Sequence, residues 1–244
     1  MKKFNWKNLW INARLLLMIG LVVFLYSFTS KRNDARKTQK TVVEFVNETE
    51  LFVSYETVNK LLIEKGQHLK TIGKDKVVLN KLEKMLNEHD MIQKSEVFVS
   101  IDGVLKAMVT QRTPIARVFN QEGSFYIDNK GNRMPLSEIQ TARVPLVLGE
   151  INDKNEKEIY DLLWFIYNDD FLKKNITGIE ILPSGSLRMT NRNYKYDIEF
   201  GKTIEVERKF DNYKAFFQKA VHDTLINKYK VINLKFTQQV VCTK

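Results

Sequence analysis

A hydrophobic stretch near the N-terminus, Leu9–Phe28, limits the possible folds of this chain more than any other feature. Its length is about that needed for a helix to cross the core of a bilayer. Only Asn12 and Arg14 interrupt it, both near its start, and the favourable insertion of its many aliphatic and aromatic residues outweighs the cost of one off-centre arginine. We therefore expect a transmembrane anchor over residues 9–30, preceded by a short N-terminal segment, residues 1–8.

Aromatic and basic side chains near the ends of this stretch are typical of membrane–water interfaces. Trp6 and Trp10 mark one interface and Tyr26 the other, while the long side chain of Arg14 can reach back to the head groups. The alternative is a cleaved signal peptide, but the apolar core is long for one and no clear small-x-small cleavage site follows it. Basic residues flank both ends in similar number, so the positive-inside rule leaves the orientation open.

The positive charge of the chain is concentrated around this stretch. Residues 1–40 hold nine Lys and Arg and one acidic residue, a net charge of +8, which leaves +2 of the total +10 for the rest. Cations in that position meet anionic lipid head groups, whereas a nucleic-acid binder needs a basic patch on its folded body. The charge therefore predicts contact with the lipid bilayer and no nucleic-acid partner. Residues 31–40 are charged, lack apolar periodicity and are expected to form a juxtamembrane linker. The single cysteine, Cys242, excludes an internal disulfide.

Residues 41–113 have the pattern of a small unit that mixes helices and strands. A β-rich run, Thr41–Val46, is followed by two stretches with apolar residues at helical spacing, which begin after Ser54 and Asp75. Asp102-Gly103 then lies between two alternating runs, a strong hairpin signal because both turn residues need positive φ. The predicted order is β-α-α-β-β, with both helices on one face of a small sheet.

Residues 114–244 predict a mainly antiparallel β domain with two helices. Apolar residues at helical spacing indicate one helix around Ile159–Ile166 and another from about Glu205 to His222. Three consecutive strands are expected between Ile176 and Phe200, separated by turns rich in Gly, Ser and Asn. A last strand is expected at Tyr229–Val241. The body as a whole is therefore expected to belong to the α+β class.

Short patterns along the body occur in an order that resembles one protein family. They are Glu96-Val97 with its hairpin, Gln111–Arg117, Tyr126-Ile127-Asp128 with Gly131, Val144-Pro145-Leu146 with Gly149, and Val231–Phe236. Together with the short basic N-terminus, the single anchor and the β-α-α-β-β unit, which looks like a POTRA domain, they make nearly the whole chain similar to the bacterial cell division family FtsQ/DivIB. The family usually has an acidic residue where Gln111 stands, and its terminal strand commonly reads Asp-Leu-Arg-Tyr where this chain has Asn-Leu-Lys-Phe.

The resemblance implies a non-enzymatic scaffold of the divisome that supports septum formation. It implies an inner-membrane protein with residues 1–8 in the cytoplasm and the body outside, which binds FtsB (DivIC) and FtsL. In this family a C-terminal strand at a sheet edge receives FtsB as an added strand, so that backbone hydrogen bonds give affinity. The matching positions here are Tyr229, Val231, Asn233, Lys235 and Phe236. An edge of the POTRA-like unit is a second expected surface, for other division proteins.

Titratable residues do not form a catalytic pattern in the sequence, and no cofactor, metal or small-molecule substrate is expected. The candidates are three histidines far apart in the sequence, two adjacent aspartates and a Ser-Gly-Ser turn: His68, His89, His222, Asp169, Asp170 and Ser184–Ser186. Two other functions remain as alternatives. A membrane-tethered exported enzyme requires titratable residues that converge in a pocket, and a POTRA-bearing chaperone or translocation factor typically carries a membrane barrel, for which amphipathic strands are too few here.

Overall fold

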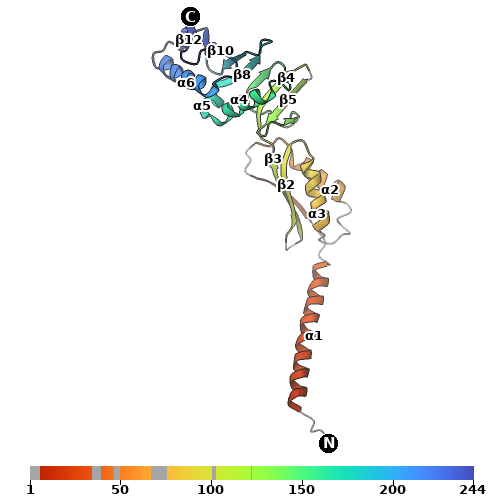
Figure 1. Cartoon of the computed structure of the whole chain (residues 1–244). Helices are drawn as coiled ribbons and strands as arrows, with labels where there is room; N and C mark the ends of the chain where they lie inside the picture. The colour runs from red at the N-terminus through yellow and green to blue at the C-terminus, as the bar shows by residue number, and fades with distance from the viewer. Residues whose placement is uncertain (1–5, 35–39, 47–49, 67–75, 101–102, 122) are drawn as a thin grey trace. The chain divides into compact units, whose positions relative to one another are not determined.

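The computed structural model describes residues 6–34, 40–46, 50–66, 76–100, 103–121 and 123–244 (Figure 1). The chain divides into two compact units, the first made of Met1–Glu48 and Ser54–Thr110 and the second of Thr49–Val53 and Gln111–Lys244. The division after Thr110 lies close to the sequence-based boundary at residue 113. The short segment Thr49–Val53, which leaves the first unit and returns to it, was not expected from the sequence.

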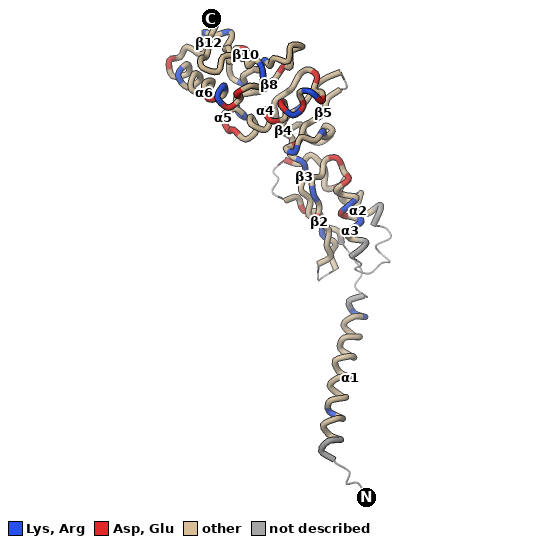
Figure 2. The backbone as a smooth tube through the Cα atoms, viewed as in Figure 1, with Lys and Arg blue, Asp and Glu red and all other residues tan. Residues whose placement is uncertain are grey.

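Helix α1 (Trp6–Asp34) contains the hydrophobic stretch. Its segment Trp10–Arg32 is long and apolar enough to cross a membrane, and Figure 2 shows few charged residues along it, so α1 is a candidate membrane anchor. Trp10, Arg14 and Tyr26 all have exposed side chains, while the side chain of Trp6 lies outside the described residues. The helix continues beyond residue 30 to Asp34, so the first part of the expected linker is helical.

The first unit confirms the predicted order β-α-α-β-β. It consists of β1 (Lys40–Phe45), α2 (Tyr55–Gly66), α3 (Lys76–Asn87), β2 (Ile92–Val99) and β3 (Val104–Gln111). The strands form a sheet in the order β1-β3-β2, with β1 parallel to β3. Ser54 begins α2, because its hydroxyl oxygen accepts the backbone N–H of Thr57 at 2.9 Å.

One face of this sheet is covered by the two helices. Val58 and Leu62 of α2 and Leu82 and Leu86 of α3 are buried, as are the alternating strand residues Val43, Val97, Leu105, Ala107 and Val109. The apolar stripe that the sequence shows at helical spacing is therefore the side on which these helices pack. The α+β class expected from the sequence is confirmed.

The second unit is built on a nine-stranded sheet of order β12-β11-β10-β9-β8-β7-β4-β5-β6. The strands are β4 (Pro114–Asn120), β5 (Gly123–Asp128), β6 (Arg133–Met134), β7 (Leu146–Leu148), β8 (Ile176–Ile181), β9 (Leu187–Asn191), β10 (Asp197–Gly201), β11 (Val231–Asn233) and β12 (Val241–Thr243). Most neighbours are antiparallel; β4 with β7, β7 with β8, and β10 with β11 are parallel.

The two helices expected in this unit are α4 (Glu156–Asn168) and α6 (Val206–His222). A short third helix, α5 (Asp170–Asn175), follows α4, and a single 3-10 turn spans Ile226–Lys228. Helix α5 is too short to show apolar periodicity in the sequence. It begins at Asp169, whose carboxylate accepts the backbone N–H of Leu172 at 2.9 Å.

A continuous row of buried side chains runs across the second sheet. Paired positions on successive strands place Val118, Val147, Ile179, Met189, Ile198 and Ile232 side by side on one face. Each is at most 1% exposed, and together with residues of α4, α5 and α6 they form one hydrophobic core. The neighbouring residue of each strand points to the opposite face, as the two-residue period of a strand requires.

The prediction of one continuous strand over Tyr229–Val241 is wrong. The structure has two short antiparallel strands instead, β11 and β12, joined by residues 234–240. The break begins at Asn233, whose side-chain oxygen accepts the backbone N–H of Lys235 at 2.9 Å. Such a local Asn turn competes with strand hydrogen bonds and so ends the strand.

A half-buried ion pair joins the start of α5 to α6. Lys214 Nζ lies 2.5 Å from Asp169 Oδ2, and both side chains are less than a third exposed. Burial acts to raise the pKa of Asp169, but hydrogen bonds from Lys214 and from the N–H of Leu172 outweigh it and hold the pKa below its ordinary value.

Replacing Lys214 with methionine is therefore expected to lower the free energy of unfolding by about 1–2 kcal/mol at neutral pH. Because the folded-state pKa of Asp169 is lowered, the pair stabilises the fold fully above the ordinary aspartate pKa of about 4 and loses this effect as the pH falls further. Urea unfolding at several pH values measures this, with the exposed Lys219 of the same helix, changed to methionine, as the control. A Lys214→Met effect that persists unchanged at acid pH would contradict the assignment.

Candidate functional site

The candidate site is the end of the second sheet formed by the C-terminal strands. The sequence predicted one strand at this edge, and the structure has two. Strand β11 lies between β10 and β12 and is therefore not at the edge. The N–H of Asp197 donates to the carbonyl of Lys230 at 3.0 Å, and the N–H of Leu234 donates to the carbonyl of Glu199 at 2.9 Å. Lys230, just before β11, also donates its N–H to the carbonyl of Thr243 at 2.8 Å. Val231 and Asn233 pair with Thr243 and Val241 of β12.

Strand β12 is the outermost strand of the second sheet, next to β11, and therefore forms this edge. Val241 pairs with Asn233, and Thr243 pairs with Val231. Because the backbone groups of Val241 and Thr243 face β11, the N–H and C=O of Cys242 face away from the sheet. Within the part of the chain that the structure describes, no strand lies beyond them.

Exposed apolar side chains lie around this edge, alongside the exposed Lys235 and Lys244. Val241 is 42% exposed and Phe236, in the loop before β12, is 52% exposed. The side chain of Cys242 points to the other face, where it packs against the hydrophobic core. Burial raises the pKa of the Cys242 thiol, which makes it less reactive than an exposed thiol.

The five sequence-predicted residues fall in different places. Tyr229 precedes β11 and packs edge-on against Phe216, with ring centroids 5.5 Å apart. Asn233 and Lys235 both contact Glu199 of β10 on the outer face, and the Lys235 Nζ–Glu199 Oε2 distance is 2.6 Å. Val231 pairs on both sides within the chain.

Phe236 is the one large apolar residue of this predicted set that is exposed among the described residues. The residues that sequence reasoning missed are Val241–Thr243. Their only signal in the sequence is a short β-branched run after two glutamines, which is continuous with the expected strand Tyr229–Val241.

A buried glutamine, Gln111, bonds to the segment Glu50–Val53 within the second unit. The side-chain oxygen of Gln111 accepts the N–H groups of Phe52 at 2.7 Å and Val53 at 2.9 Å. Its amide nitrogen donates to the carbonyl of Glu50 at 3.3 Å. A carboxylate, which the FtsQ/DivIB pattern has here, accepts the same two N–H groups but cannot donate to Glu50 unless it is protonated. The departure at Gln111 thus adds one hydrogen bond.

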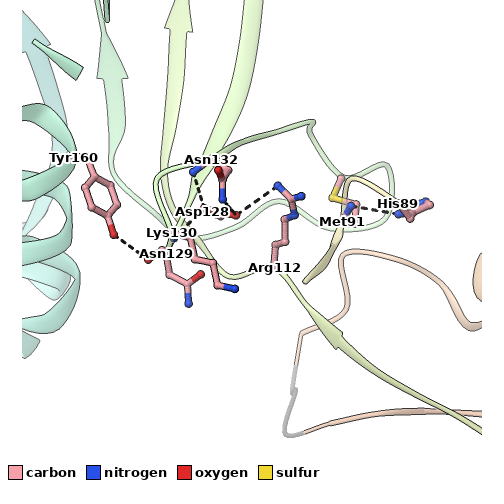
Figure 3. A network of polar contacts seen from close by, with 8 residues as sticks. All are labelled: His89, Met91, Arg112, Asp128, Asn129, Lys130, Asn132 and Tyr160. Atoms are coloured by element: carbon pink, nitrogen blue, oxygen red, sulfur yellow. Dashed lines mark hydrogen bonds and ion pairs between the residues drawn. The ribbon is translucent and has the colours of Figure 1, made fainter. Parts of the chain in front are cut away.

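Asp128 is the centre of the polar network in Figure 3. It is buried, and its oxygens accept the backbone N–H groups of Lys130 at 2.9 Å and Asn132 at 2.8 Å, while Arg112 lies 3.5 Å away. These donors fix the tight turn after β5, in which Gly131 has a φ of +82°. The carboxylate is thus occupied in holding the turn.

The other titratable candidates also have structural partners. His89 Nδ1 accepts the backbone N–H of Met91, and Asp169 caps α5 and pairs with Lys214. His222 is exposed beside Asp223. His68 lies outside the described residues. Among the residues that the structure describes, no group of three or more His, Cys, Asp and Glu is placed to hold a metal ion.

An open cleft of about 900 Å³ lies at the carboxyl ends of the parallel strands β4, β7 and β8. Phe119, Leu148 and Ile181 contribute apolar surface, and Glu150 and Lys154 are the charged residues among those that line it. One carboxylate and one ammonium group do not form a nucleophile-base-orienter arrangement. The Ser184–Ser186 turn borders the cleft as the link between β8 and β9.

The fold and the site together define an α+β protein with a candidate N-terminal membrane anchor and a sheet that ends in an uncovered strand. The chain belongs to the family described as FtsQ/DivIB, C-terminal related, whose model matches residues 113–243. Membership in this family supports a role in cell division.

Among solved structures, the chain is similar to the major extracytoplasmic domain of the trans isomer of the bacterial cell division protein DivIB from Geobacillus stearothermophilus. The identity is 15% and the TM-score 0.33, over 46% of this chain and 95% of that one. None of the curated proteins compared with the chain matches it.

Proposed function

We propose that this chain is a non-enzymatic, membrane-anchored scaffold of the bacterial divisome, and that it binds partners of the FtsB/DivIC and FtsL type by adding a partner strand to β12. The observation that carries the proposal is the uncovered edge, where the N–H and C=O of Cys242 face away from β11. An unpaired strand edge is a template for another chain, since each outward backbone group can form a hydrogen bond with it.

The partner-binding surface in this proposal comprises Val241–Thr243 and the exposed Phe236, with Lys235 at the border. Val231 and Asn233 support it from within by pairing with β12. Tyr229 supports it through its packing on α6. In this proposal, most of the five residues expected from the sequence therefore support the position of β12 and do not contact the partner strand directly.

The proposed topology follows the family. Residues 1–8 lie in the cytoplasm, α1 crosses the inner membrane, and both units lie on the extracytoplasmic side. The first unit serves as a POTRA-like domain, and residues 114–244 serve as the partner-binding domain. The candidate anchor and the family membership support this arrangement.

The proposal is tested by two substitutions at one position. Cys242→Pro removes the outward N–H without removing a bond to β11, whereas Cys242→Ala keeps that N–H and shortens the side chain. We expect Cys242→Pro to weaken capture of a purified FtsB-type partner at least about tenfold, because it loses a backbone hydrogen bond and blocks close approach. Cys242→Ala is expected to bind like the parent chain.

Thermal unfolding of both variants is the control, since a loss of fold would also reduce capture. Both variants are expected to melt within a few degrees of each other. Equal capture by a folded Cys242→Pro chain and the parent would rule out strand addition at β12.

A further inference from the structure

Residues 50–53, the described part of Thr49–Val53, are held in the second unit in an unusual way. The rest of that unit begins only at Gln111, after the helices α2 and α3 and the strands β2 and β3. In the described part of the chain, the backbone of residues 50–53 is hydrogen-bonded by two side chains, those of Gln111 and Ser137. A sheet strand, in contrast, is held by the backbone of its neighbours. We call residues 50–53 the strap.

Gln111 gives the strap the bonds that a neighbouring strand would give. Its side-chain oxygen accepts two successive N–H groups, those of Phe52 and Val53, and its amide nitrogen donates to the carbonyl of Glu50. Gln111 is 0% exposed, so water does not compete for these bonds. A single buried amide therefore bonds three of the four residues of the strap.

Ser137 ties the strap to a second segment, the connection between β6 and β7. Its hydroxyl donates to the carbonyl of Phe52 at 2.7 Å. The same oxygen accepts the N–H groups of Ile139 at 3.2 Å and Gln140 at 3.3 Å, which fixes a turn in the connection. The strap and this turn thus share one hydroxyl group.

The connection depends on few other contacts for its order. It spans residues 135–145, all of them described, and contains no helix or strand. Its second tie is the N–H of Ala142, which donates to the buried hydroxyl of Tyr126 at 3.0 Å. Arg143, next to this tie, is exposed. Loss of the bond from Ser137 to the strap would therefore leave the connection with one of these two ties.

The strap combines buried side chains with flanks that are fixed. Phe52 is 8% exposed and Val53 is 4% exposed, which favours the bound position. On one side, the N–H of Val46 donates to the carbonyl of Val109; on the other, Ser54 caps α2. A short segment with both flanks held can leave its place and return to it at little cost in loop entropy. Because it has fewer hydrogen bonds than the sheet, we expect it to open before the sheet does.

We propose that the strap is a latch with two states. In the closed state Gln111 and Ser137 hold it, and the connection 135–145 is ordered. In the open state the strap leaves both side chains, and the connection becomes accessible around Arg143, while the nine-stranded sheet stays intact. The order of a surface segment in the second unit is thus controlled by a segment that lies in the sequence between β1 and α2.

Amide hydrogen exchange of the full chain in detergent, read residue by residue by NMR, tests the latch. Gln111→Met keeps the length of the side chain but removes all three of its bonds to the strap. It should speed exchange at Phe52 and Val53 at least about tenfold, and change exchange at Ile179 in the buried row less than about twofold. Gln121→Met, at an exposed glutamine, is the matched control and should leave all three amides unchanged.

A milder pair of substitutions tests the second tie. Ser137→Ala removes the hydroxyl and should speed exchange at Phe52 and Val53 at least about threefold, because the strap loses one of its bonds. Ser137→Thr keeps the hydroxyl and should exchange like the parent chain. This pair keeps the test informative if Gln111→Met does not fold.

Limited digestion of the same full-length chains with trypsin tests the effect on the connection. Cleavage after Arg143 should be at least about fivefold faster in Gln111→Met and in Ser137→Ala than in the parent chain, since the open state exposes this bond. Cleavage after the exposed Lys219 of α6 is the internal reference and should not change.

Three results would overturn the proposal. Equal acceleration of exchange at Ile179 and at Phe52 would show that the strap opens only when the whole unit unfolds. Parent-like exchange at Phe52 and Val53 in both Gln111→Met and Ser137→Ala would show that these side chains do not hold the strap. An unchanged rate of cleavage after Arg143 in a variant with a fast-exchanging strap would show that the strap does not control the connection.

Discussion

Replacing Lys209 with methionine is expected to lower the free energy of unfolding of the second unit by about 3 kcal/mol. Lys209 is 2% exposed, and its Nζ donates to the carbonyls of Phe200 at 3.0 Å and Lys202 at 2.7 Å. The ammonium group also lies 4.7 Å from the centre of the Phe200 ring. Methionine has a similar length but no donor, so both carbonyls would lose their partner.

The ammonium group donates to two backbone carbonyls, at the end of β10 and in the turn that connects β10 to α6. Burial lowers the pKa of Lys209, and the nearby Glu205 partly offsets this. Urea unfolding followed by circular dichroism measures the loss, and Lys219→Met on the exposed side of the same helix is the matched control, expected to change stability by less than about 0.5 kcal/mol. Equal effects of the two substitutions would show that the buried contacts of Lys209 contribute nothing.

Ile198→Ala is expected to cost about 3–4 kcal/mol in the free energy of unfolding. Ile198 is 0% exposed and lies in the middle of the buried row, beside Met189 of β9 and Ile232 of β11. The loss combines the transfer free energy of the removed methylene and methyl groups with the cost of the cavity they leave.

The adjacent residue provides the control for this substitution. Asp197 is exposed on the opposite face of β10, so Asp197→Ala is expected to change stability by less than about 0.5 kcal/mol. The pair tests the register of the sheet, because a shift by one residue would exchange the two faces. A larger effect at Asp197 than at Ile198 would contradict the register.

The parts of the fold that the sequence predicted correctly depend on local patterns. Apolar residues at helical spacing located α2, α3, α4 and α6. The hairpin expected at Asp102-Gly103 falls between the neighbouring strands β2 and β3, where Gly103 has a φ of +84° and Asp102 lies outside the described residues. These signals are repeated over several residues or need an uncommon backbone conformation, which few other structures satisfy.

The parts that were missed depend on single side chains that reach distant backbone. Asn233 ends β11 by accepting the N–H of Lys235, which turned one expected strand into two. Gln111 fixes Phe52 and Val53, more than fifty residues earlier in the chain. Glu83 and Asn87 of α3 likewise accept the N–H groups of Val97 and Ser95 of β2, although both have the sequence pattern of ordinary surface residues of a helix. No periodicity marks such contacts, because each depends on a fold that is already assembled.

The candidate site illustrates the same limit. The resemblance to FtsQ/DivIB predicts a partner-binding strand at the end of the chain, and among the described residues the sheet there ends in an uncovered strand. The particular strand, however, is β12 and not β11, because the turn at Asn233 allows the last residues to fold back. A strand this short and close to the terminus carries too few residues to show an alternating pattern.

The most direct test of the proposed function is amide exchange at Cys242 in the presence of a purified FtsB-type partner. In the chain alone this amide should exchange rapidly, while those of Val241 and Thr243 are slowed by β11. Addition of the partner should slow exchange at Cys242 by about a hundredfold, as a new strand forms along the edge. Unchanged exchange at Cys242 in a complex whose formation is verified independently would contradict strand addition at this edge.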